Sequence, residues 1–132
     1  MEHRFNRRII ADLRVLIYKY SIPMAVGRIK NGTRYGLYIE SDFADVGALQ
    51  LLGLEILFYS PLNILQRFKF NTIVTHTTDN GFGVELDGLE GINDQICELL
   101  RDTPPTPKES ELHNIVAREW SDYSPGKGTA YI

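Results

Sequence analysis

The sequence of 132 residues is poor in the residues that build covalent or metal-based sites. It has one cysteine, Cys97, so neither an internal disulfide nor a metal site made only of cysteines can form. Its three histidines, His3, His76 and His113, do not have the spacing of metal ligands. We therefore expect no metal and no cofactor, and we expect a binding protein rather than an enzyme.

Long hydrophobic runs are also missing. The most apolar stretch, residues 46–65, is interrupted by Gln50, Glu55 and Asn63 and is broken at Pro61. The N-terminal residues lack the apolar core of a secretory signal peptide. These features predict a protein without a membrane partner, located in the cytoplasm or in the interior of a virion.

Positive charge is scarce overall but concentrated at one end. The net charge of −3 excludes a nucleic-acid binder that is basic over its whole surface. Residues 1–40 carry eight Lys or Arg against three Asp or Glu, whereas residues 41–132 carry six against fourteen. This asymmetry predicts either charge pairing within the assembly or an anionic partner for the N-terminal end.

Residues 4–20 have the pattern of an amphipathic helix. When these residues are projected around a helix axis at 100° per residue, one sector of the circle is apolar and the opposite sector is basic. The apolar sector contains Phe5, Ile9, Ile10, Leu13, Leu16, Ile17 and Tyr20. The basic sector contains Arg4, Arg7, Arg8, Arg14 and Lys19, together with Tyr18.

Two β-hairpins are predicted from turn residues between apolar segments. Asn31-Gly32 lies between residues 24–29 and 35–39 and supplies the positive φ of a tight turn. Residues 78–81 lie between segments 70–77 and 82–86, and in the second of these segments apolar side chains alternate with polar ones or glycine.

The other segments predict helices and a linker. Ser41 is expected to cap a helix over residues 42–52, and Ser60-Pro61 to begin a short helix over residues 62–68. Residues 54–59 fit either a buried strand or more helix. Helices are expected over residues 91–102 and after the proline-rich segment 103–107.

Together these elements predict an α+β fold. We expect an antiparallel sheet built from two β-hairpins, flanked by the N-terminal amphipathic helix and by C-terminal helices. Residues 1–102 would form a single α+β domain, residues 103–107 a linker, and residues 108–132 a helix and arm.

An acidic stripe complements the basic sector. Glu90, Asp94, Glu98 and Asp102 recur every fourth residue, and like charges at this spacing destabilise an isolated helix. Each stripe therefore either lies in solvent or faces opposite charge, within the chain, on a second copy or on another partner. The C-terminal arm has aromatic or apolar residues that are typical of interfaces: Trp120, Tyr123, Tyr131 and Ile132.

Three functions remain open from the sequence. The leading hypothesis is a non-enzymatic protein-binding or assembly protein that self-associates, by analogy with small phage regulatory and virion-assembly proteins, through both stripes and the arm. The first alternative is a nucleic-acid-binding regulator that uses the basic face of the first helix. The second is a small-ligand binder or enzyme with a site near His76, which requires a concave pocket with convergent polar groups.

Overall fold

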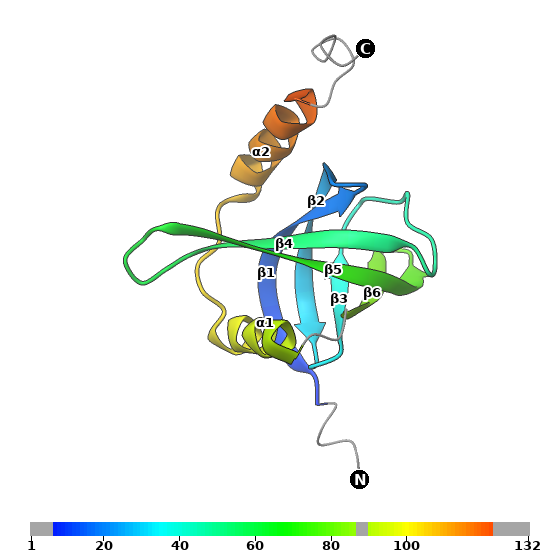
Figure 1. The fold of residues 1–132 in the computed structure, drawn as a ribbon, viewed down its shortest axis with the longest axis horizontal. Helices are drawn as coiled ribbons and strands as arrows, with labels where there is room; N and C mark the ends of the chain where they lie inside the picture. Colours follow the sequence, from blue (N-terminus) through cyan, green and yellow to red (C-terminus); the bar gives the residue numbers. More distant parts are fainter. Residues whose placement is uncertain (1–6, 87–89, 123–132) are drawn as a thin grey trace.

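The chain folds into a closed antiparallel β-barrel followed by two helices (Figure 1). The computed structural model describes residues 7–86 and 90–122. The strands are β1 (Ile9–Lys19), β2 (Ile22–Gly32), β3 (Gly36–Glu40), β4 (Leu51–Tyr59), β5 (Leu65–Thr78) and β6 (Gly81–Leu86). They close in the order β1-β2-β3-β6-β5-β4, since β1 pairs with β4 as well as with β2.

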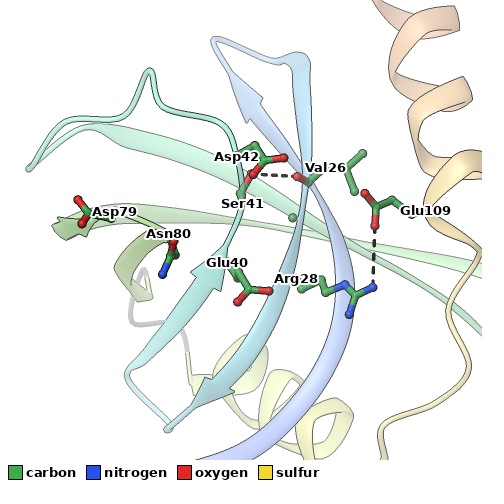
Figure 2. A pocket seen from close by; sticks show the side chains of 9 residues that line it. Val26, Arg28, Glu40, Ser41, Asp42, Asp79, Asn80 and Glu109 are labelled. Carbon is green, nitrogen blue, oxygen red and sulfur yellow. Dashed lines mark hydrogen bonds and ion pairs between the residues drawn. The ribbon is translucent and has the colours of Figure 1, made fainter.

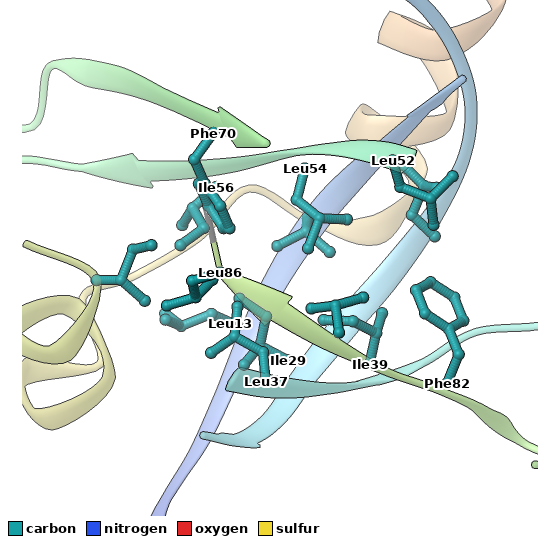
Figure 3. Packing of buried hydrophobic residues seen from close by; sticks show 14 of the residues in the cluster. Leu13, Ile29, Leu37, Ile39, Leu52, Leu54, Ile56, Phe70, Phe82 and Leu86 are labelled. Carbon is teal, nitrogen blue, oxygen red and sulfur yellow. The ribbon is translucent and has the colours of Figure 1, made fainter. Parts of the chain in front are cut away.

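The barrel interior is the main hydrophobic core. Alternate residues of each strand point inward, as the two-residue period of a strand requires. Figure 3 shows ten of these side chains converging from all six strands: Leu13, Ile29, Leu37, Ile39, Leu52, Leu54, Ile56, Phe70, Phe82 and Leu86. Helix α1 (Glu90–Asp102) contributes Ile96 and Leu100 to the same core and thereby covers part of the barrel.

Helix α2 (Glu109–Asp122) lies against the outside of the barrel. Leu112 and Ile115 pack on Leu16, Tyr18 and Leu57, which point outward from β1 and β4. These residues form a second, smaller hydrophobic core. The wall between the two cores is therefore apolar on both of its faces.

The predicted N-terminal helix is wrong, because residues 9–19 form β1. Leu13, Val15 and Ile17 face the barrel interior, while Leu16 and Tyr18 lie under α2. With both faces of the strand buried, apolar residues follow one another without a two-residue alternation. When this segment is projected as a helix, most of its large apolar residues fall in one sector, as they would in an amphipathic helix.

The α+β fold class is wrong for the same reason. Instead of a sheet of two hairpins flanked by helices, all six strands close into one barrel, and both helices of the described residues follow it. Residues 42–52 are not a helix, because Ser41 Oγ accepts from Phe43 N in a local turn and β4 begins at Leu51. Residues 62–68 form the tip of the β4–β5 hairpin and the start of β5.

Several local predictions are confirmed within this different architecture. β5 pairs with β6 around the turn at residues 79–80, and β2 pairs with β3. The turn predicted at Asn31-Gly32 is wrong, because both residues belong to β2 and pair with Tyr38 and Leu37, and the chain turns after them, at residues 33–35. Residues 54–59 are strand, and α1 and α2 form where helices are expected. Local patterns therefore identified pairs of neighbouring strands, whereas closure of the barrel depends on pairs that are distant in sequence.

Candidate functional site

A pocket lies on the outer wall of the barrel where β3, β6 and β5 run side by side. Tyr38 on β3 pairs with Gly83 on β6, which pairs with His76 on β5, so these three residues form one row across the sheet. The pocket has a volume of about 400 Å³, within the usual range for small-molecule sites. Its other polar lining residues are Arg8, Thr33, Tyr35, Thr75 and Glu85.

A β-bulge turns His76 onto this outer wall. Val74 pairs with Val84 and His76 with Gly83, so Thr75 is an extra residue without a partner on β6. In regular alternation His76 would follow an outward Thr75 and point into the barrel. The bulge instead leaves both side chains exposed on the same surface.

The position of the His76 imidazole depends on the glycine at position 83. A Cβ atom at position 83 would collide with the His76 ring, so only glycine allows the ring to lie across β6. The Nδ1 atom of His76 is 3.1 Å from the hydroxyl of Thr75. Within the described residues His76 has no hydrogen bond to a carboxylate, which is the partner that would orient it as a general base.

The two sides of the pocket are held by hydrogen bonds. The Tyr38 hydroxyl donates to Thr78 Oγ1 at 2.7 Å, because the Thr78 hydroxyl itself donates to Gly81 O. The Thr33 hydroxyl oxygen accepts from the backbone N–H groups of Tyr35 and Gly36. These contacts fix the Tyr38 ring and the Thr33 hydroxyl.

Arg8 provides the positive charge of this pocket. It lies immediately before β1, is exposed, and donates from Nη1 to Asn31 Oδ1 at 2.6 Å. Glu85 provides a carboxylate on the same pocket wall. The lining thus offers one cationic group, one anionic group, aromatic rings and hydroxyls to a single ligand.

A second pocket, of about 260 Å³, has a different character (Figure 2). Glu40, Asp42 and Asp79 place carboxylates around it, and its one cationic lining residue, Arg28, lies 3.9 Å from Glu109. No aromatic side chain lines it, and the described residues contain no group of His, Cys, Asp or Glu placed to hold a metal ion. Anionic ligands are therefore repelled from this pocket.

The residues of the predicted basic stripe are separated by the barrel. Arg7 is exposed before β1, whereas Arg14 donates to Pro107 O at 3.0 Å, and Lys19 is 3.0 Å from Asp45. Arg4 lies outside the described residues. Because residues 9–19 are a strand, the helical face on which the nucleic-acid hypothesis depends is absent, and Arg8 is the one described residue of this stripe that lines the outer-wall pocket.

Tyr18 belongs to a polar network beneath α2. Its hydroxyl donates to the buried Glu55 at 2.7 Å, and Arg67 donates to both oxygens of Glu55, at 2.9 and 3.0 Å. Arg67 also lies 3.2 Å from Glu119 of α2. Burial and the bond to Glu55 raise the pKa of Tyr18, and hydrogen bonds to Glu55 and Glu119 raise the pKa of Arg67.

The acidic stripe and the arm are only partly described. Asp94 is 3.0 Å from Arg34, and Glu98 and Asp102 are exposed on α1. Among the described residues, no ion pair joins the acidic stripe to the basic one. Trp120 is partly exposed on α2, and the side chain of Glu90 and residues Tyr123, Tyr131 and Ile132 lie outside the described part.

Sequence reasoning identified His76 and Arg8 separately but missed the residues that join them. Tyr35 and Tyr38 appear in the sequence as ordinary hairpin residues, and no local signal marks the bulge at Thr75. The one available hint was Gly83, a glycine that replaces a side chain on the outer face of an otherwise regular strand.

Comparison with known proteins identifies no relative that would assign this site. The sequence matches no model of a protein family, and no curated protein is significantly similar to it. No helix in the described part of the chain is long and apolar enough to cross a membrane. The function must therefore be inferred from the chemistry of the pocket itself.

Proposed function

We propose that the protein is a ligand-binding module that takes a phosphorylated aromatic compound, of the nucleotide class, in the outer-wall pocket. The observation that carries this proposal is the convergence of Arg8, Tyr35, Tyr38, His76 and Glu85 on one hollow of about 400 Å³. These residue types complement the parts of a nucleotide: an anionic group, a flat ring and ring-edge hydrogen-bond donors.

Arg8 is the expected phosphate ligand. A guanidinium group binds phosphate oxygens through charge-assisted and often paired hydrogen bonds. One of its nitrogens already donates to Asn31, which orients the group at the edge of the pocket. Arg7 is exposed beside it and adds to the positive potential at this edge.

The glycine-lined floor and the ring side chains suit a flat base. Gly36 leaves the outer face of β3 without a side chain, and the His76 ring fills the corresponding space over Gly83, so a planar group can lie on β3 beside that ring. Tyr35, Tyr38 and His76 offer rings on which a base stacks, and the Glu85 carboxylate accepts hydrogen bonds from amino groups at a base edge.

Binding rather than catalysis is favoured by what surrounds His76. Its hydrogen-bond partner is the Thr75 hydroxyl, and the structure describes no carboxylate bonded to it. General-base catalysis needs an oriented and activated base. We therefore assign His76 to ligand contact.

The test is a binding titration of the purified protein with a panel of mono-, di- and cyclic nucleotides, the corresponding nucleosides and inorganic phosphate. We expect at least one nucleotide to bind and its nucleoside to bind more weakly. Arg8→Ala should weaken nucleotide binding by about 10- to 100-fold, the usual contribution of a hydrogen bond to a charged group.

Arg34→Ala is the matched control. Arg34 is an exposed arginine that pairs with Asp94 and does not line the pocket, so its removal should leave the affinity unchanged. The proposal fails if no member of the panel binds at millimolar concentration, or if Arg8→Ala and Arg34→Ala have equal effects.

A further inference from the structure

Glu85 is the one anionic residue among the described residues that line the outer-wall pocket. Its side chain is exposed on β6, and in the described part of the chain no ion pair includes it. A carboxylate repels a phosphate group, so Glu85 does not belong to the part of the pocket that receives the phosphate. Its position in the sheet therefore indicates which other part of a ligand it contacts.

Strand pairing places Glu85 far from the anchor of Arg8. Arg8 is bonded to Asn31 on β2, and the row of paired residues that contains Asn31 continues through Tyr38 on β3 to Gly83 on β6. Glu85 lies two residues further along β6. From the usual strand spacing and rise, Asn31 and Glu85 are roughly 10 Å apart across the sheet and about 7 Å apart along it. This separation is comparable with the length of a nucleotide from its phosphate to the far edge of its base.

The surface beside Glu85 suits the edge of a flat ring. The residue paired with it on β3 is Gly36, which has no side chain, and Tyr35 lines the pocket next to this glycine. The Leu86 N–H donates to the Tyr35 carbonyl oxygen at 2.8 Å, which ties Tyr35 to the residue after Glu85. Side chains stand roughly perpendicular to a sheet, so the Glu85 carboxylate rises beside the edge of a base that lies over Gly36.

A carboxylate distinguishes the bases by the donors on their edges. When ionised it only accepts hydrogen bonds, and its two oxygens accept from two neighbouring donors at once. Guanine has such a pair of donors in its ring N1–H and its amino group. In adenine and cytosine the amino group lies next to a ring nitrogen that is an acceptor, and in uracil the ring N–H lies between two carbonyl oxygens. These acceptors repel the second carboxylate oxygen.

We infer that the outer-wall pocket selects guanine nucleotides, with the Glu85 carboxylate accepting from N1–H and the amino group of the base. This inference rests on the proposed nucleotide-binding function and adds the identity of the base. Arg8 binds the phosphate at the other end of the ligand. The two opposite charges also fix the direction of the ligand, because in the reverse orientation the phosphate would face Glu85.

A calorimetric titration of the full chain with purine nucleoside monophosphates tests this selection. We expect guanosine monophosphate to bind most tightly. Inosine monophosphate keeps N1–H but lacks the amino group, so it should bind about 10- to 100-fold more weakly, the usual contribution of a hydrogen bond to a charged group. Adenosine monophosphate has an acceptor where guanine has N1–H and should bind more weakly still.

The outcomes separate this inference from the proposed function. If adenosine monophosphate binds as tightly as guanosine monophosphate and Arg8→Ala weakens both, the selection of guanine is wrong and the nucleotide site remains. If no nucleotide binds at millimolar concentration, both proposals are wrong.

Glu85→Gln tests the contact itself. A glutamine amide donates as well as accepts, which matches the edge of adenine rather than that of guanine. The variant should therefore bind guanosine monophosphate about 10- to 100-fold more weakly and adenosine monophosphate more tightly than the unmodified protein does. If the affinities for both nucleotides rise together, Glu85 acts only through its charge, and its assignment to the base edge is wrong.

Glu40→Gln is the matched control. Glu40 is an exposed carboxylate on the neighbouring strand β3 that does not line the outer-wall pocket, so the same loss of charge there should leave both affinities unchanged. Both glutamate side chains are exposed, so both variants should have the circular dichroism spectrum of the unmodified protein. Equal effects of Glu40→Gln and Glu85→Gln on the two affinities would overturn the inference.

Discussion

Two polar regions of the outer barrel wall differ in how their hydrogen bonds are used. Beneath α2, Tyr18, Glu55 and Arg67 bond to one another; Tyr18 and Glu55 are buried, while Arg67 stays 37% exposed at the edge of the network and pairs with Glu119 of the helix. On the wall formed by β3, β6 and β5, Tyr38 and His76 are fixed by threonine hydroxyls, and the surface in front of them is an open pocket. Polar side chains beneath a helix attach that helix, whereas fixed polar side chains around an open hollow are available to a ligand.

The strongest test of this contrast removes the cation from the covered network. Arg67→Met leaves the Glu55 carboxylate, whose side chain is 9% exposed, with Tyr18 as its remaining partner. A buried charge without its partner is costly, so we expect the free energy of unfolding to fall by about 3 kcal/mol. Urea denaturation measures the change, with Arg34→Met, which breaks an exposed ion pair, as a control expected to change stability by less than about 1 kcal/mol.

Equal losses for the two variants would contradict the distinction between a covered network and an exposed pair. The ligand affinity of the open pocket should be the same in both variants, because neither Arg67 nor Arg34 lines it.

Substitutions of Gly81 and Gly83, two residues apart on β6, test whether the open pocket is independent of the packing that holds the barrel together. A Cβ atom at position 81 would collide with the backbone oxygen of Ile39, which cannot move without disturbing β3, so Gly81→Ala should cost about 2 kcal/mol of stability. A Cβ atom at position 83 would collide with the exposed His76 ring, which can rotate away. Gly83→Ala should therefore cost less than about 1 kcal/mol while reducing nucleotide affinity.

Thermal unfolding and a binding titration of both variants separate the two effects. The interpretation is wrong if Gly83→Ala destabilises the barrel as much as Gly81→Ala does, since His76 would then be part of the barrel packing rather than of a ligand surface.

The smallest expected effect concerns the hydroxyl of Tyr18. Because its pKa is raised in the folded protein by burial and by the bond to Glu55, the folded state holds this proton more tightly than the unfolded state. The resulting stability is complete below pH 10, the ordinary tyrosine value, and is lost as the pH rises above it. Tyr18→Phe should cost about 1 kcal/mol at pH 8 and lessen the decline between pH 8 and pH 10.5.

Urea denaturation at the two pH values gives this comparison directly. If the unmodified protein and Tyr18→Phe lose stability in parallel between pH 8 and pH 10.5, the hydroxyl of Tyr18 has no role in the alkaline loss.

Local chemistry in the sequence predicted local structure. The turn before Gly81 and the apolar spacing of Ile92, Ile96 and Leu100 act within a few residues, and the β5–β6 hairpin and α1 form as expected. The prediction for β1 is wrong because burial of its outer face depends on α2, which begins one hundred residues after β1 begins. The sequence suggested a site near His76, but the residues that line the pocket with it could not be predicted, because Arg8, Tyr38 and His76 meet only after β3 pairs with β6 and the bulge turns His76 outward.

The closure pattern of the barrel also sets an order of events during synthesis. Gly36 pairs with Glu85 and Val15 with Ile56, so the two pairings that close the cylinder join residues more than forty positions apart. Distant pairings of this kind slow folding, because a long loop must be ordered before they form. While the ribosome is still translating the chain, the β1–β2 hairpin can form, but the wall of β3, β6 and β5 cannot exist until Leu86 has left the exit tunnel.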